Sequence, residues 1–280
     1  MRLRPALLLS LLLATAPGPV LAELRLNTEL TLGSDSNLNN GRRGAVDRAG
    51  GFFAGRAGLE QSWDFGRRGS LSLQPGLELE AHQDYQSLDQ ARAALQLRYA
   101  VRGGRGFYAP LLGLSADVGW QDHAAALRDG ADLRLGLSLR EALTTRIAVQ
   151  LHGSFAWRDA DQAAFDIATR TYALEADWKT SERWTIYGGL RRQLGDFTST
   201  GRPAPELIPL FDAVAPDDSF APGELAFRRA GDAWIAELGG NYRLDAHWAL
   251  DLQGLGIRTD SRFGTEYERL QTRLSLLGRF

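Results

Sequence analysis

Histidines are the residues of this sequence best suited to acid–base chemistry. One of the four is close enough to a serine for the two to act as the base and nucleophile of a hydrolase. His152 stands two residues before Ser154, so both would project from the same face of an extended strand. A serine nucleophile also needs a group that orients its base. His82 and His123 each lie close to an aspartate, but this spacing supplies no metal signature and is typical of polar rim residues. We therefore expect no catalytic residue, no metal and no cofactor.

Composition excludes several classes of protein. The chain has 280 residues, no cysteine and a formal net charge of −2. Because phosphate-driven affinity needs a basic excess, we expect no nucleic-acid partner. The lack of cysteine excludes disulfide frameworks, thiolate metal sites and the lipid-anchored cysteine of a lipoprotein.

The first 22 residues have the pattern of a secretory signal peptide. Arg2 and Arg4 precede an apolar run over residues 6–14, and helix breakers at residues 17–19 precede a small residue, Ala22. A membrane anchor is the alternative, but the apolar run is short for one. The sequence predicts cleavage after Ala22 and a mature domain over residues 23–280.

From residue 23 onward the hydrophobic pattern has a period of two. In the last segment Leu270, Leu274 and Leu276 share one face, while Arg269 and Arg273 occupy the other. Counting such segments predicts twelve strands, centred near residues 28, 58, 76, 97, 115, 136, 151, 173, 189, 238, 253 and 274.

The predicted connections alternate between short turns and longer loops. Short turns are expected at residues 64–69, 102–106, 140–144, 179–183 and 244–247. Longer loops are expected at residues 33–50, 83–90, 121–130, 158–166, 195–231 and 258–266. Short turns on one side and long loops on the other are typical of bacterial outer-membrane barrels.

Tryptophans fall near the strand ends, on the apolar face. They are Trp63, Trp178, Trp184 and Trp248 near the short turns, and Trp120, Trp157 and Trp234 near the long loops. This placement predicts two aromatic girdles at the membrane interfaces, whereas tryptophans of a soluble sandwich core would also occur in mid-strand.

A sheet in hydrocarbon must close on itself, because every backbone polar group has to be paired. The polar face carries too many charges for a dry core, so it is expected to line a wet lumen while the leucines face lipid. We therefore predict an all-β fold, a transmembrane antiparallel up-and-down barrel of twelve strands. Its predicted lumen-lining residues are Glu78, Glu80, Arg92, Arg98, Asp117, Arg134, Arg146, Glu175, Asp177, Arg191, Glu237, Asp251, Arg269 and Arg273.

Acids and bases alternate on neighbouring predicted strands, for example Glu78 beside Arg92, and Arg146 beside Glu175 and Asp177. Ladders of opposite charge predict weak ion selectivity, a narrow pore or an occluded one. The alternative is that these side chains are solvated without fixed pairing.

The longest predicted loop, residues 195–231, holds five of the ten prolines and an apolar patch. This patch, Leu207, Ile208, Leu210 and Phe211, is a candidate constriction folded into the mouth. A mobile surface loop is the alternative.

Three motifs resemble known families. The alternating segment that ends on Phe280 resembles the terminal assembly signal of outer-membrane barrels, which implies the barrel-assembly machinery as a partner. Residues 33–40 resemble a loop in barrels of surface lipoprotein assembly modifiers, but this chain lacks the helical-repeat domain that usually precedes such barrels. The spacing of His152 and Ser154 is similar to that of outer-membrane phospholipase A, whose supporting asparagine is missing here.

Together these features predict a passive or gated channel for small polar solutes, not an enzyme, in the outer membrane of a Gram-negative bacterium, with both termini in the periplasm. The alternatives are an assembly or export barrel for a surface lipoprotein or polysaccharide, and a lipid-modifying enzyme. Expected partners are outer-membrane lipid and lipopolysaccharide, the latter through Arg42, Arg43 and Arg48.

Overall fold

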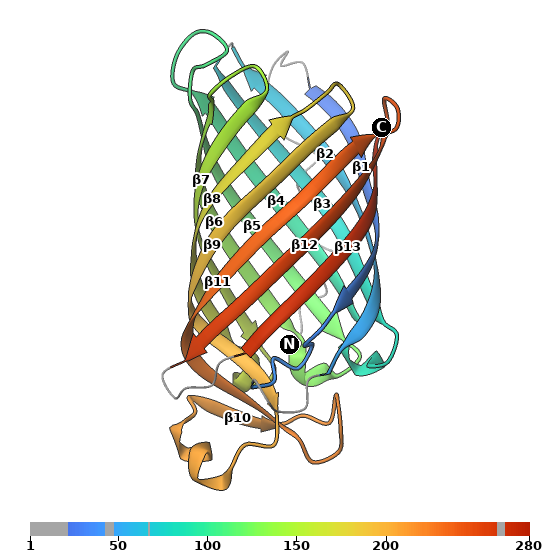
Figure 1. Cartoon of the computed structure of the whole chain (residues 1–280), viewed down its shortest axis with the longest axis vertical. Helices are drawn as coiled ribbons and strands as arrows, with labels where there is room; N and C mark the ends of the chain where they lie inside the picture. The colour runs from blue at the N-terminus through green and yellow to red at the C-terminus, as the bar shows by residue number, and fades with distance from the viewer. Residues whose placement is uncertain (1–21, 43–47, 67, 262–266) are drawn as a thin grey trace.

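The computed structural model describes residues 22–42, 48–66, 68–261 and 267–280 as a closed antiparallel barrel of twelve strands (Figure 1). The barrel strands are β1 (Ala22–Asp35), β2 (Gly50–Phe65), β3 (Gly69–His82), β4 (Gln90–Arg102), β5 (Leu111–His123), β6 (Gly130–Ala142), β7 (Ile147–Ala160), β8 (Ile167–Lys179), β9 (Trp184–Gly201), β11 (Leu225–Arg243), β12 (Trp248–Ser261) and β13 (Tyr267–Arg279). Consecutive barrel strands pair, and the ring closes where β1 pairs with β13. The predicted fold class and strand number are confirmed.

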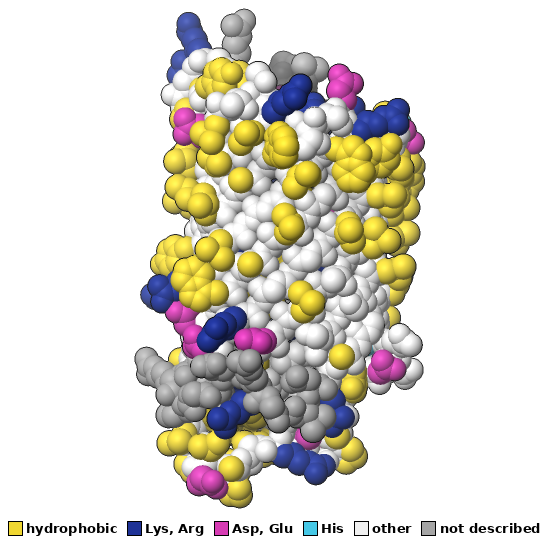
Figure 2. All heavy atoms as spheres, in the orientation of Figure 1, with side chains coloured by type: hydrophobic (Ala, Val, Ile, Leu, Met, Phe, Trp, Pro, Cys, Tyr) yellow, Lys and Arg dark blue, Asp and Glu magenta, His cyan; other side chains and the backbone are white. Residues whose placement is uncertain are grey.

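Side chains alternate between the two faces of the wall, as the period of two predicts. Opposite each other on β1 and β13, Leu30 and Leu276 lie on the outer face, while the hydroxyls of Thr31 and Ser275 meet inside at 2.6 Å. Leu174, in the middle of β8, is 54% exposed. On the face drawn in Figure 2, apolar side chains form a broad belt around the barrel, and charged side chains gather near its two ends.

Two predicted connections differ from the structure. The β4–β5 turn spans residues 103–110 and is longer than expected. The predicted loop 195–231 is strand at both its ends, because β9 and β11 stay paired as far as Gly201 and Leu225. β12 pairs with β11 only from Gly231 onward. Residues 225–228 of β11 pair instead with a short strand, β10 (Ala213–Pro216).

Both described ends of the chain lie at the short-turn end of the barrel. The backbones of Leu26 and Phe280 exchange two hydrogen bonds of 2.8 and 2.9 Å. Ala22 is the first residue of β1, and the rest of the predicted signal peptide lies outside the described residues. Within the described part of the chain, no helix is long and apolar enough to cross a membrane.

Three similar loops form what we call the collar of the long-loop end: residues 83–89, 124–129 and 161–166. Each contains one 3-10 turn, namely η2 (Gln86–Leu88), η3 (Ala126–Arg128) and η4 (Ala163–Phe165). Each ends in an aspartate (Asp89, Asp129 or Asp166) whose Oδ1 accepts a hydrogen bond from the backbone N–H of the preceding strand's last residue (His82, His123 or Ala160). Neighbouring loops are joined by the backbone hydrogen bonds from Ala124 to Asp89 and from Asp161 to Asp129. The collar is therefore held mainly by backbone groups.

Candidate functional site: the lumen and its covered mouth

One wall of the lumen carries a network of ionic side chains centred on Arg92 of β4. Its guanidinium donates to Asp132 on β6 at 2.6 Å, to Glu78 on β3 at 3.4 Å, and to Asp117 on β5. The Arg92 side chain is only 11% exposed. Arg56 on β2 adds a second ion pair to Glu78, at 3.3 Å. Three carboxylates therefore share two cations across five adjacent strands.

A second network lies on the wall formed by β8, β9 and β11. Arg191 of β9 pairs with Glu175 of β8 at 3.3 Å and with Glu237 of β11. Nearby, the Tyr187 hydroxyl donates to Asp251 of β12 at 2.7 Å. Ladders of opposite charge thus line parts of the wall.

Some predicted neighbours are not partners. Arg146 lies in the turn before β7, and Asp177 of β8 pairs instead with Arg140 of β6. The inner residue of β7 beside Asp177 is Ala148, which is small enough for the arginine to reach across it. Arg98 and Arg134 lie on the inner face of β4 and β6, and in the described residues neither forms an ion pair.

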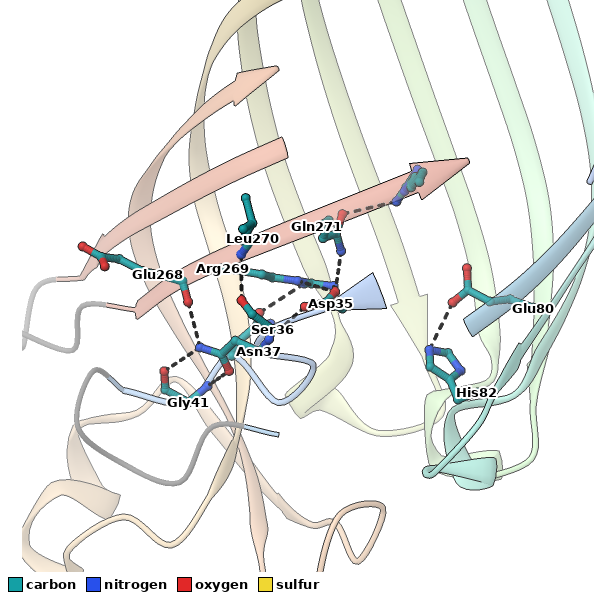
Figure 3. A network of polar contacts seen from close by, with 12 residues as sticks. Asp35, Ser36, Asn37, Gly41, Glu80, His82, Glu268, Arg269, Leu270 and Gln271 are labelled. Carbon is teal, nitrogen blue, oxygen red and sulfur yellow. Dashed lines mark hydrogen bonds and ion pairs between the residues drawn. The ribbon is translucent and has the colours of Figure 1, made fainter. Parts of the chain in front are cut away.

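The described part of the first long loop, residues 36–42 and 48–49, folds into the mouth of the barrel (Figure 3). Asp35, at the end of β1, is 2% exposed and accepts hydrogen bonds from Arg269, from Gln271 and from the backbone N–H of Asn37. Asn37 is 1% exposed and binds the backbone of Gly41 through both ends of its amide. The loop is thus held inside the wall of β13.

The same loop reaches across to β9, which the ring separates from β1 by three strands. The side-chain amides of Asn39 and Asn40 donate to the backbone carbonyls of Thr200 and Thr198 at 3.1 and 3.0 Å. Arg48, expected to face lipopolysaccharide, pairs with Glu224 at 3.3 Å. Arg42 is exposed, and Arg43 lies outside the described residues.

A second cover comes from residues 202–224, which we call the lobe. Asp217 in the lobe is completely buried, and it accepts hydrogen bonds from Arg128 of the collar at 2.6 Å and from Thr200 of β9 at 2.7 Å. Burial lowers the pKa of the Arg128 guanidinium, and the Asp217 carboxylate opposes that shift.

The lobe also reaches the opposite side of the ring. Phe220 packs edge-on against Tyr85, with ring centroids 5.1 Å apart, and Ser87 donates to the carbonyl of Ser219 at 2.9 Å. Tyr85 and Ser87 belong to the β3–β4 loop, which lies five strands from β9. The first loop and the lobe therefore cover the long-loop mouth from two sides, and together they are called the cover below.

The predicted constriction patch lies in the lobe. Leu207, Ile208 and Leu210 belong to η5 (Pro205–Leu210), which projects past the end of the barrel in Figure 1. Phe211 stacks on Phe227 of β11 at 4.4 Å. The apolar patch helps to build the lobe, and residues 217–220 of the same connection make the contacts across the mouth.

Cavities remain on the other side of the cover. One cavity of about 580 Å³ lies at the short-turn end beside Arg98 and Asn241, and one of about 230 Å³ lies beside Arg92, Glu80 and Arg273. The Arg273 guanidinium stands 5.8 Å from the centroid of the Phe52 ring. The lumen is thus polar and hollow at its short-turn end, and covered at the other.

Three histidines stand out in the sequence as candidates for chemistry, namely His82, His123 and His152. His152 and Ser154 both lie on the inner face of β7. His82 lies 3.4 Å from Glu80 (Figure 3), and His123 lies 3.9 Å from Asp129. Among the described residues, no three or more His, Asp or Glu side chains are grouped so as to hold a metal ion.

The tryptophans lie on the outer face in two rows. Trp120, Trp157, Trp178, Trp184 and Trp234 are all exposed, and Trp63 and Trp248 stand at the short-turn ends of β2 and β12. Phe280 packs against the rings of His247 and Trp248 at 5.5 and 5.2 Å.

No family model matches this chain, and no curated protein matches it. Among solved structures, an outer membrane channel from Pseudomonas putida F1 superposes with a TM-score of 0.60 at 13% identity, over 92% of this chain and 95% of that one. The chain has the fold of that channel. The KdgM porin superposes with a TM-score of 0.46 at 11% identity, over 91% of this chain and 99% of that one. For the NanC porin the TM-score is 0.49 at 7% identity, over 89% and 98%.

Proposed function

We propose that this protein is an outer-membrane channel for small polar solutes, with a gate at its long-loop end. The observation that carries the proposal is the contrast between the two faces of one closed wall. The inner face holds ionic networks around cavities, and the outer face is a belt of exposed leucines. Since charges are costly to bury in a dry core and open sheet edges are costly in lipid, this contrast suits a water-filled barrel in a bilayer.

The proposed orientation follows from the connections. Short turns of outer-membrane barrels face the periplasm, and long loops face outward. Both described ends would then lie on the periplasmic side, where Phe280 would serve as the signal for the barrel-assembly machinery. Lipid and lipopolysaccharide would surround the apolar belt. The likeness to the solved channel shows the fold, and the lumen chemistry supports the function.

The cover implies that permeation is gated. Its contacts join the first loop to β9 and the lobe to the collar. Barrels of eight strands are nearly filled by side chains and those of sixteen are open, so a pore of twelve strands can be closed by loops of this size. Ionic contacts at the edge of such a cover can break and re-form without unfolding the wall.

The test is single-channel recording in planar bilayers. We expect discrete conductance steps, rare in the wild type and frequent in a variant whose residues 203–223 are replaced by a short Gly-Ser linker. Circular dichroism would establish that both barrels are folded. Silence of both folded proteins would contradict the channel and favour the assembly or export role.

A further inference from the structure

A cavity of about 300 Å³ opens at the short-turn end, on the inner side of β5 to β8. The β4–β5 turn covers part of it through Phe107 and Ala109, while β6 and β8 supply Arg140 and Asp177. In the proposed orientation this cavity lies at the periplasmic entrance of the lumen.

The lining of this cavity is strongly basic. Four cations, Arg102, Arg140, Arg146 and Lys179, face one carboxylate, Asp177, which leaves a formal charge of +3. The whole chain carries −2. The excess is local, since the cavity beside Arg92 is lined by equal numbers of cations and carboxylates.

The cations are held together by the fold. The backbone N–H of Lys179 donates to the carbonyl of Arg146 at 2.7 Å, which places the two residues side by side on neighbouring strands. Asp177 is engaged by Arg140, and the Arg102 guanidinium donates to the neutral carbonyl of Ala109 at 3.3 Å. In the described part of the chain, neither Arg146 nor Lys179 forms an ion pair.

An apolar wall faces these cations. Phe107 is 57% exposed although it lines the cavity, and Tyr108 packs edge-on against it at 5.2 Å. Leu111, opposite Arg102 and Arg140 on the neighbouring strands, also belongs to the lining. Cations at one side and an aromatic ring at the other match an anion that carries an apolar body.

We propose that this cavity is a binding site for small organic carboxylates with an apolar group. The site deepens the proposed function, because a ligand held at the periplasmic entrance would be one of the solutes of the channel. Arg146 and Lys179 bind the carboxylate, and Phe107 contacts the apolar group. Electrostatic attraction also concentrates such anions at the entrance.

The test is equilibrium dialysis of radiolabelled benzoate against the full-length protein in detergent micelles. The double variant Arg146→Gln/Lys179→Gln should bind benzoate about tenfold more weakly, since it removes two ionic contacts that are each modest because they are partly exposed. Asp177→Asn removes the opposing carboxylate and should bind severalfold more tightly. Arg183→Gln, in the exposed β8–β9 turn and outside this lining, is the matched control and should bind as the wild type does.

Opposite responses of the two cavity variants cannot arise from misfolding. Equal benzoate affinity in all four proteins would overturn the site. Acetate, which lacks the apolar body, should bind more weakly than benzoate, and equal affinity would overturn the role of Phe107. Conductance steps without benzoate binding would contradict the proposed binding site but not the proposed channel. Benzoate binding by a barrel that shows no conductance would contradict the channel but not the binding site.

Discussion

Asp217 should control how often the proposed channel opens. Its carboxylate is completely buried in the lobe and is the acceptor for both Arg128 of the collar and Thr200 of β9. Substitution of Asp217→Asn keeps the size of the side chain but removes the charge. Arg128 would then remain mostly buried with no carboxylate beside it, so the covered state should lose stability relative to the open state.

The size of the effect follows from the burial of the pair. The Arg128 side chain is 16% exposed, and Asp217 is not exposed at all. Removing one partner of a buried ion pair costs about 3 to 5 kcal/mol. Because the asparagine can still accept one hydrogen bond, we expect the lower end, about 3 kcal/mol, which corresponds to roughly a hundredfold shift toward the open state.

Single-channel recording at fixed voltage measures this shift as the fraction of time spent open. The double variant Arg128→Gln/Asp217→Asn removes both charges, so it should recover much of the covered state. Arg202→Gln in the exposed part of the lobe is a control that should behave as the wild type does. An open fraction for Asp217→Asn within a factor of two of the wild type would refute the cover as the gate.

Three further outcomes are expected. Arg92→Gln leaves three carboxylates with one cation, so zero-current potentials in a KCl gradient should show a more cation-selective pore. Thermal unfolding should show that the free energy of unfolding falls by about 3 kcal/mol. Unchanged potentials would contradict the role of the network. Leu174→Arg on the lipid face should cost about 2–4 kcal/mol in refolding into vesicles, whereas Thr171→Arg on the inner face of the same strand should refold normally. Gly195→Ala places a Cβ 2.1 Å from a backbone oxygen at a φ of 135° and should lower the urea midpoint, while Gly256→Ala, with no atom within 4 Å, should not.

The sequence predicts the barrel well because a closed wall with an apolar outer belt and a polar inner face follows a simple rule. Where a strand crosses the apolar belt, leucines such as Leu274 must point outward and residues such as Arg273 inward, so the period of two is clear. The rule also fixes the strand number, since each crossing repeats the pattern. All twelve predicted strands are therefore found in the structure.

The same rule fails beyond the belt. In the predicted loop 195–231, β9 and β11 continue without the outward leucines of the belt. Phe197 and Phe227 are buried, while Thr198 and Thr200 alternate with them and donate hydrogen bonds to Ala164 of the collar and Asp217 of the lobe. Such strands lack the pattern of outward leucines by which the other strands are predicted, and the prolines of the lobe favour the prediction of a loop.

Ion-pair partners were predictable only where the side chains are direct ladder neighbours. Glu78 and Arg92 stand opposite each other on β3 and β4, and they pair. Asp177 pairs with Arg140 across the intervening strand, because a long arginine passes over Ala148. Strand order alone does not predict an ion pair between residues on strands that are not neighbours.

The collar and the cover differ in what holds them, and this difference determines which of them can move. The collar uses backbone hydrogen bonds and an aspartate at the end of each turn, a repeat visible in the sequence at Asp89, Asp129 and Asp166. Across the mouth, the cover makes side-chain contacts such as the Arg128–Asp217 pair, and the Arg48–Glu224 pair joins its two parts; one backbone hydrogen bond, from Thr200 to Asn39, also holds the first loop to β9. Side-chain contacts can break singly, whereas the linked backbone of the collar would have to open together. Opening should therefore displace the first loop and the lobe across a collar that stays in place.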